Sequence, residues 1–206
     1  PERPIEWESQ MPIRYAEAER LFASAYIGER ALLVDGLSSV KARDVPTPNS
    51  YKQALAGDFR EFWNEAVLKE ISNLQDHDVY EWSELPPGRR AIDATWAFRV
   101  KSNAGGLVDK FKARLCARGF RELWGQDYVE THAPTTTFVS WRACLADAAK
   151  HGYKVSIFDI KSAYLLAPLA ETIYMKPFDG LKPPRPGMVL RLRKALYGLK
   201  QAGRAW

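Results

Sequence analysis

Cysteine and histidine are scarce in this chain, which has two cysteines and three histidines among 206 residues. Cys116 and Cys144 are too few for a disulfide framework or a zinc site, so we expect the protein to reside in a reducing compartment. His77, His132 and His151 share no metal-ligand spacing and are interpreted as structural or surface residues. These counts argue against a zinc protein and against a disulfide-rich secreted domain.

Long apolar runs are missing as well. No stretch approaches the ~18–20 consecutive apolar residues of a membrane-spanning helix, and no signal-peptide pattern opens the chain. We therefore expect no membrane partner. The chain begins with Pro1 rather than Met and ends at Trp206, inside a segment that looks amphipathic. We expect it to be a piece of a longer protein.

Apolar and aromatic residues, by contrast, are abundant. Hydrophobic residues make up 46% of the chain and aromatic residues 12%, which is enough to bury a core in one or two domains. Lysine and arginine number 30 against 25 acidic residues, a formal net charge of +5. This excess suits an anionic partner but is too small to identify one by itself.

Residues 1–48 are predicted to form a connector with no chemistry of its own. The stretch YAEAERLFASAYIGERALLV favours a helix followed by a strand. The two prolines of DVPTPNS then mark a boundary. We expect one domain to occupy the rest of the chain, from residue 49 to 206.

Two later segments have the periodicity of amphipathic helices. In 50–74 the apolar residues recur about every 3.6 positions, and Ser50 and Gln53 have the spacing of a capping box. A second helix is predicted over about 140–150, ended by Gly152. With the strands predicted around them, the order of elements indicates an α+β fold rather than a regular succession of βαβ units.

A β-hairpin is predicted between the two helices. Its strands, 96–101 and 110–118, alternate apolar with basic residues on either side of the turn-forming SNAGG. The turn lacks the spacing of a phosphate-binding glycine-rich loop. One face of the hairpin is expected to carry six cations: Arg99, Lys101, Lys110, Lys112, Arg114 and Arg118.

Two interpretations of this cationic face stay open. Lysine and arginine are common on ordinary solvated faces. However, no acidic residue interrupts 110–118, whereas a merely solvated face usually mixes charges of both signs. The second observation favours a surface that binds phosphates.

The alternating stretch 153–159 is predicted to be a strand that ends in Asp159. A carboxylate at the end of a buried strand costs free energy to dehydrate unless a cation meets it. Taken alone, an aspartate in this place is more often a turn or cap residue than a metal ligand. Two further strands are predicted at 171–176 and 188–193, separated by a proline-rich loop.

Taken together, several blocks of the chain resemble the reverse transcriptase of copia-type LTR retrotransposons. They lie in register over about 50–206: SYKQAL, FWNEAVLKEISNL, the strand around Trp96, KFKARLCARGF, GQDYVETHAPT, FDIKSAYL, ETIYMKPFDG and ALYGLKQAGRAW. No single block is specific. Their common order and spacing carry the resemblance.

The resemblance implies a right-hand polymerase fold, in which residues 49–206 supply the fingers and the first part of the palm as an antiparallel sheet with packed helices. It implies transfer of a nucleotide from a dNTP to a DNA primer 3′-hydroxyl, directed by an RNA template. It also implies integrase and RNase H segments in the same polyprotein. The expected location is intracellular, in a cytoplasmic virus-like particle or the nucleus.

The resemblance also implies an active site. Asp159 matches the first of three catalytic aspartates and, with the main-chain carbonyl of Ile160, would bind Mg²⁺, of which the reaction uses two ions. Tyr164 matches the aromatic residue that excludes a 2′-hydroxyl, because a ring pressed on C2′ leaves no room for an extra oxygen. Gln201 matches a glutamine beside the 3′-hydroxyl of the incoming nucleotide.

The hairpin cations receive roles in the same way. Lys112 or Arg114 would grip the triphosphate, and the choice between them stays open; only arginine can contact two phosphate oxygens at once. The remaining cations are expected to contact nucleic acid: Arg99, Lys101, Lys110 and Arg118.

Some positions depart from the pattern of the family. Glu122 stands where glutamine is usual, Leu166 and Ala167 replace an Asn-Gly pair, and the usual glutamine before the proline of the IYM block is missing. The adjacent Asp-Asp pair of the active site is not in the chain and would lie beyond Trp206. One carboxylate of three cannot hold two metal ions, so the chain alone is expected to be inactive.

Two functions are therefore carried forward. The first is a segment of an RNA-directed DNA polymerase. The alternative is a non-catalytic nucleic-acid-binding remnant of a degraded element. A structural module with no anionic partner would explain the composition but not the order of the blocks.

Overall fold

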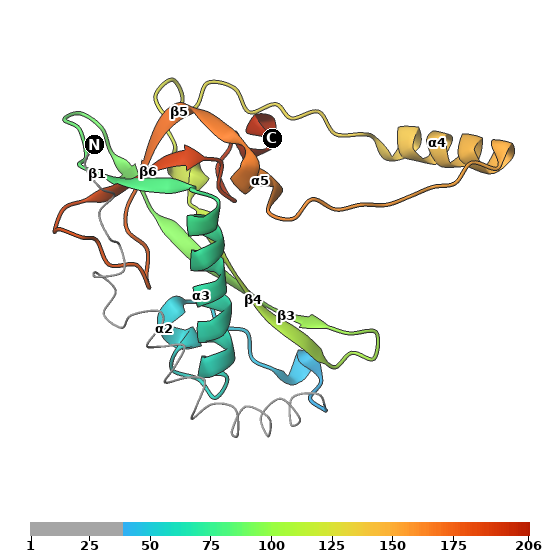
Figure 1. Ribbon diagram of the computed structural model, residues 1–206, viewed down its shortest axis with the longest axis horizontal. Coiled ribbons are helices and arrows are strands. Elements are labelled where there is room, and N and C mark those ends of the chain that lie inside the picture. The colour runs from blue at the N-terminus through green and yellow to red at the C-terminus, as the bar shows by residue number, and fades with distance from the viewer. Residues whose placement is uncertain (1–38) are drawn as a thin grey trace, which may run out of the picture. The chain divides into compact units, whose positions relative to one another are not determined.

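The computed structural model describes residues 39–206 (Figure 1). Their contacts divide them into two compact units. The first unit contains 39–68, Trp96–Arg114 and Pro184–Pro186; the second contains Lys69–Thr95, Leu115–Pro183 and Gly187–Trp206. The helix and strand predicted before residue 39 lie outside the described residues. Among the described residues, none of the helices could span a membrane.

In the first unit, two helices replace the single helix predicted over 50–74. Helix α2 spans Tyr51–Ala54 and helix α3 spans Arg60–Asp76, which continues into the second unit. The segment between them contains Gly57, and glycine is less favourable than alanine in a helix by about 1 kcal/mol. The prediction of one continuous helix is wrong at this point.

Hydrogen bonds fix the segment before α2 at two places, near Ala42 and at Ser50. The Ser50 hydroxyl accepts a hydrogen bond from Gln53 N–H (3.2 Å), which confirms the Ser50 half of the predicted capping box. The Gln53 side chain accepts instead from Asn49 N–H (2.8 Å). Upstream, a short 3₁₀ helix, η2 (Ala42–Asp44), begins with Ala42 N–H donating to the Gly106 carbonyl (3.0 Å). Part of the expected connector therefore pairs with the turn of the hairpin.

The predicted hairpin is confirmed. Strands β3 (Ala94–Ser102) and β4 (Val108–Ala117) form a two-stranded sheet, most of it in the first unit. Trp96 and Ala113 are buried, as the alternation predicts. The Trp96 ring stacks on Tyr51 of α2, with ring centroids 6.4 Å apart.

Aromatic rings form much of the core of the first unit. The Trp63 ring meets Phe98 and Phe111 edge-on, with centroid distances of 5.3 and 4.6 Å. Phe62 stacks on Phe111 at 5.1 Å. Edge-on and offset-stacked pairs are the favourable geometries for aromatic side chains. These contacts fix α3 against β3 and β4 within this unit.

A four-stranded sheet forms the centre of the second unit. Its strands are β1 (Tyr80–Ser83), β2 (Ala91–Ile92), β5 (Pro168–Met175) and β6 (Val189–Lys194), in the order β1-β6-β5-β2 (Figure 1). Strand β6 is antiparallel to both neighbours, and β2 runs parallel to β5. The strands predicted at 171–176 and 188–193 are confirmed as β5 and β6.

The core of the second unit lies on this sheet and the short segments beside it. Three short helices belong to these segments: η3 (Gly119–Arg121), α5 (Ala163–Leu166) and α6 (Ala202–Ala205). The largest fully buried apolar side chains are Leu74, Val79, Leu115, Leu165, Ile173, Met175, Leu190 and Leu196. The described residues therefore form a mixture of helix and sheet, as expected for the α+β class.

Helix α4 (Phe138–His151) confirms the helix predicted over 140–150. The Thr137 hydroxyl caps its first turn, and Gly152 ends it with φ of +66°. The strand predicted over 153–159 is wrong, because these residues are irregular and exposed. Alternating apolar residues give a segment a possible strand face, but a strand also needs a hydrogen-bonded neighbour, and none of the described strands pairs with it.

Candidate functional site

The ten site residues selected from the sequence are divided between the two units. The first unit holds Arg99, Lys101, Lys110, Lys112 and Arg114. The second holds Arg118, Asp159, Ile160, Tyr164 and Gln201. Geometry within each unit decides which members of each group lie together.

The five cations of the first unit lie on the two strands of the hairpin. Arg99, Lys110 and Lys112 are exposed. Lys101 and Arg114 are half-buried. Ala113, between Lys112 and Arg114, is buried, so the predicted alternation holds on β4. Asp109 is exposed at the start of β4, and the run of one sign begins only after it.

Arg118 follows β4 and belongs to a group of charges around Asp93. Its N–H donates to the Asp93 carbonyl (2.8 Å), while the Asp93 carboxylate pairs with Lys176 (2.9 Å) and Arg121 (2.7 Å). The hydrogen bond from Lys176, aided by the charges of Lys176, Arg121 and Arg118, lowers the pKa of the Asp93 carboxyl. Three cations around one carboxylate leave this part of the surface positive.

Asp159 lies in the irregular, exposed segment after α4. Its neighbour Phe158 is 85% exposed, and Ile160 is exposed as well. The Asp159 carboxylate has no hydrogen bond or ion pair with any residue of 39–206. Within the same range, no three His, Cys, Asp or Glu side chains are placed to hold a metal ion. A single carboxylate offers the hard oxygen that Mg²⁺ prefers, but it does not complete a two-ion site.

Tyr164 lies on α5 and is half-buried. Its ring packs against Tyr197 with centroids 5.3 Å apart and planes tilted by 57°. The start of α5 is fixed by the Asn73 amide, which donates to the Ser162 hydroxyl (3.2 Å). With Leu165 fully buried behind it, the Tyr164 ring has a fixed base and a partly accessible surface.

Gln201 is buried, with 2% of its surface exposed. Its Nε2 donates to the main-chain carbonyl of Asp127 (2.9 Å). Its Oε1 is buried without a hydrogen-bond partner among the described residues. The Gln201 amide therefore lies inside the second unit rather than on its surface.

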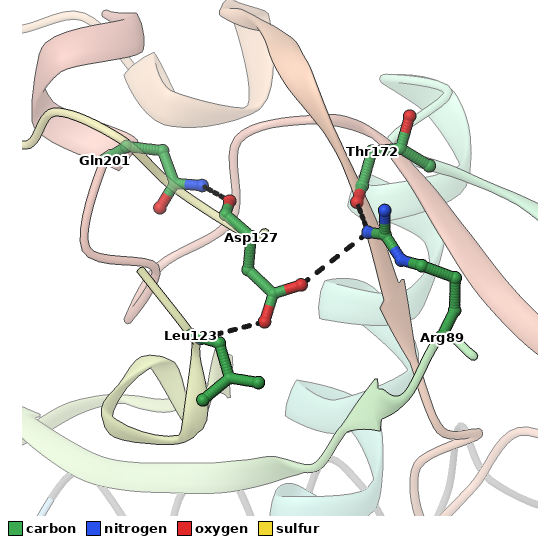
Figure 2. Close-up of polar contacts among 5 residues, drawn as sticks. All are labelled: Arg89, Leu123, Asp127, Thr172 and Gln201. Atoms are coloured by element: carbon green, nitrogen blue, oxygen red, sulfur yellow. Dashed lines mark hydrogen bonds and ion pairs between the residues drawn. The ribbon is translucent and has the colours of Figure 1, made fainter. Parts of the chain in front are cut away.

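The carbonyl that receives Gln201 belongs to a tight turn, shown in Figure 2. Asp127 is only 1% exposed, and its Oδ2 accepts a hydrogen bond from Leu123 N–H (2.9 Å). The Arg89 guanidinium lies 3.6 Å from the Asp127 Oδ1 and also donates to the Thr172 carbonyl of β5 (Figure 2). A buried carboxylate is thus matched by a largely buried cation.

A second buried carboxylate, Glu122, lies in the same region and is 4% exposed. Its Oε2 accepts a hydrogen bond from Lys200 N–H (2.9 Å), and its Oε1 is buried without a partner among residues 39–206. Burial raises the pKa of the Glu122 carboxyl, and the neighbouring Asp127 adds to this, whereas hydrogen bonds from Lys200 and Gln201 oppose it. Lys200 Nζ donates to the Tyr128 hydroxyl (2.9 Å) and lies over that ring.

The family model for reverse transcriptase (RNA-dependent DNA polymerase) matches residues 77–206, more than half of the chain. The chain belongs to this family. The match includes Asp159, Tyr164, Gln201 and the buried turn at Asp127. It confirms the identification of a copia-type reverse transcriptase region.

Curated relatives of this reverse transcriptase region are polyproteins of transposons. The chain is 32% identical over 196 residues to the retrovirus-related Pol polyprotein from transposon TNT 1-94 of Nicotiana tabacum, a match that covers 95% of the chain and 14% of the relative. It is 36% identical over 146 residues to the Pol polyprotein from transposon RE2 of Arabidopsis thaliana, covering 70% of the chain and 10% of the relative.

A third relative is the truncated transposon Ty1-A Gag-Pol polyprotein of Saccharomyces cerevisiae. It is 30% identical over 194 residues, which covers 86% of the chain and 15% of the relative. The chain therefore spans about a seventh or less of the length of these relatives. No solved structure matches the chain.

Four residues of this reverse transcriptase region escaped selection from the sequence: Arg89, Glu122, Asp127 and Lys200. The sequence marks Glu122 only as a departure from the pattern of the family. Arg89, Glu122 and Asp127 are buried or half-buried, whereas Lys200 is exposed but contacts Glu122 and Tyr128. Both burial and these contacts depend on residues that are distant in the sequence. The one local signal for Asp127 is an acid placed beside Tyr128 and three residues after Trp124 in WGQDY.

Proposed function

We propose that residues 49–206 are the fingers and the first part of the palm of an RNA-directed DNA polymerase encoded by a copia-type retrotransposon. The match of the reverse transcriptase family to residues 77–206 carries this proposal. The polymerase adds a nucleotide from a dNTP to a DNA primer on an RNA template. A right-hand fold and a connector role for residues 1–48 are parts of the same proposal.

Asp159 and the main-chain carbonyl of Ile160 are proposed metal ligands. Exposure of both residues supports this role, because a metal ion and a polyanionic substrate must reach them. Two Mg²⁺ ions would supply charge neutralisation at the reacting phosphate. The chain contributes one carboxylate, so we propose that the rest of the polyprotein contributes the others and that this portion is inactive alone.

Tyr164, Gln201 and the hairpin are proposed to bind the nucleotide. Tyr164 excludes a 2′-hydroxyl, and its packing against Tyr197 supports a fixed ring. Gln201 lies beside the 3′-hydroxyl; because it is buried, its amide becomes accessible only when the nucleotide opens this part of the unit. Lys112 or Arg114 binds the triphosphate, and the other cations bind the template and primer: Arg99, Lys101, Lys110 and Arg118.

The relatives suggest the wider setting. They are named as Pol or Gag-Pol polyproteins, and we propose that integrase and RNase H segments accompany this region in its own polyprotein. An intracellular location follows, in a virus-like particle or the nucleus.

The test is primer extension by the polymerase in which this chain continues into the segment that follows it in the parent reading frame. On an RNA template with dNTPs and Mg²⁺, we expect extension, and we expect Asp159→Asn to reduce its rate by about a hundredfold or more. Asp58→Asn removes an equally exposed carboxylate of the first unit and should leave the rate unchanged. Full activity of Asp159→Asn would overturn the role of this carboxylate.

A second candidate function is non-catalytic binding of nucleic acid by a remnant of a degraded element. It is favoured because, within residues 39–206, the exposed Asp159 carboxylate is not part of any group of three side chains that could hold a metal ion. Salt-dependent binding of RNA–DNA duplex without any extension by the longer protein would support this alternative.

A further inference from the structure

We propose that Arg89 and Asp127 act as positioning residues for Gln201, and that they leave the Gln201 Oε1 as a reserved acceptor for a hydroxyl of the incoming nucleotide. This inference rests on the proposed function, since it extends the role given to Gln201. It concerns residues of the second unit alone.

The orientation of the Gln201 amide follows from its partner. The Asp127 carbonyl, 2.9 Å away, can only accept a hydrogen bond, so the N–H side of the amide must face it. The Oε1 is then directed to the other side, where it is buried without a partner among the described residues. A buried acceptor with no donor costs about 1–3 kcal/mol, which a ligand hydroxyl would recover.

The place of that carbonyl is set by the turn from Leu123 to Tyr128. Asp127 N–H donates to the Leu123 carbonyl (2.9 Å), and Leu123 N–H donates back to the Asp127 carboxylate (2.9 Å). Gly125 N–H donates to the Tyr128 carbonyl (2.8 Å). The side chain of Asp127 thus closes the turn whose main chain receives Gln201.

Arg89 joins this turn to the central sheet. The same guanidinium nitrogen lies 3.6 Å from the Asp127 carboxylate and donates to the Thr172 carbonyl of β5, and the guanidinium also lies over the Tyr174 ring at 5.5 Å (Figure 2). Removing this cation would leave the Asp127 carboxylate buried and unpaired, a costly arrangement. The turn would then move or admit water, and the Gln201 amide would lose its fixed acceptor.

The first arm of the test uses the 206-residue chain and requires no polymerase activity. The side-chain NH₂ signal of Gln201, identified in ¹⁵N NMR spectra by its loss in Gln201→Leu, should exchange slowly with solvent. Arg89→Met should speed this exchange by about tenfold or more, as expected when a buried hydrogen bond is lost. Arg191→Met removes a comparable arginine from an exposed ion pair with Glu81 on β6 and β1 and should change nothing.

Two further variants separate positioning from general loss of structure. Arg89→Lys keeps the positive charge and should keep part of the protection. The double variant Arg89→Met with Asp127→Asn removes the uncompensated charge of residue 127 but keeps one side-chain oxygen to accept from Leu123 N–H. Exchange of the Gln201 amide should therefore be slower in the double variant than in Arg89→Met. Unchanged exchange in a folded Arg89→Met chain, or exchange in Arg89→Lys that is as fast as in Arg89→Met, would overturn the inference.

The second arm measures nucleotide use by the longer polymerase. Arg89→Met should raise the KM for dNTP by about tenfold with little change in kcat, because it weakens binding in the ground and transition states alike. If Gln201→Asn leaves this KM unchanged although exchange responds to Arg89, the proposed role of Gln201 in nucleotide binding fails and positioning of its amide stands. If Gln201→Asn raises the KM and Arg89→Met does not, the positioning inference is wrong.

Discussion

The backbone of Gly119 passes so close to that of Gly198 that a Cβ on Gly119 would lie 2.1 Å from the Gly198 carbonyl oxygen. A Cβ on Gly198 would in turn lie 2.2 Å from the Ala117 carbonyl oxygen. Ala117 N–H also donates to the Tyr197 carbonyl (2.7 Å). The end of β4 and the segment ALYGLKQAG therefore touch through main-chain atoms, which places Lys200 and Gln201 against Glu122 and Asp127.

Gly198→Ala should destabilise the chain by about 3 kcal/mol or more, because the new methyl group overlaps a carbonyl and φ is +90°. Gly187→Ala is the matched control, since Gly187 has φ of +84° but no atom within 4 Å of an added Cβ. It should cost only about 1 kcal/mol of backbone strain. Urea unfolding of both variants measures the difference, and equal midpoints would contradict the close approach.

Glu122→Gln should stabilise the chain at neutral pH by about 1 kcal/mol, because a neutral amide in this buried place avoids the cost of burying a charge. The pKa of Glu122 is raised in the folded chain, so its contribution to stability is present at low pH and is lost as pH rises from the unfolded pKa through the folded one. Unfolding free energies measured from pH 4 to pH 8 should therefore fall less in Glu122→Gln than in the unaltered chain.

Asp93→Asn should have the opposite pH dependence. The pKa of Asp93 is lowered, chiefly by the hydrogen bond from Lys176, so its stabilising contribution is present above the unfolded pKa and disappears as pH falls through the folded one. We expect the variant to be less stable by about 1 kcal/mol at pH 7 and equal to the unaltered chain near pH 2. A difference that persists unchanged in acid would show that packing rather than charge is responsible.

Arg99→Ala and Lys110→Ala, at two exposed cations of the hairpin, should each weaken binding to an RNA–DNA duplex and lower the slope of log K against log salt by about one unit. The reason is that each cation that meets a phosphate releases one counterion. Fluorescence anisotropy between low and moderate salt measures the slope. Arg191→Ala, on β6 of the second unit, serves as the charge-matched control, and an unchanged slope in both hairpin variants would exclude this face as a contact.

The sequence predicted elements well where local signals agree. Alternation identified β3 and β4, the spacing of Ser50 and Gln53 identified the cap of α2, and Gly152 identified the end of α4. The prediction from sequence failed where two local signals compete, or where a strand needs a neighbouring strand to pair with. Gly57 lies within an otherwise helical pattern, and the apolar stretch before Asp159 has strand periodicity but no strand beside it among the described residues.

By itself, the order and spacing of its blocks determined that this chain is a reverse transcriptase region, because such blocks can be read without knowing where they meet. The tertiary structure alone decided that Arg89, Asp127 and Gln201 form one buried network and that Glu122 lies beside it. These residues are far apart in the chain, and the free energy of burying a charge depends on what surrounds it rather than on its sequence neighbours.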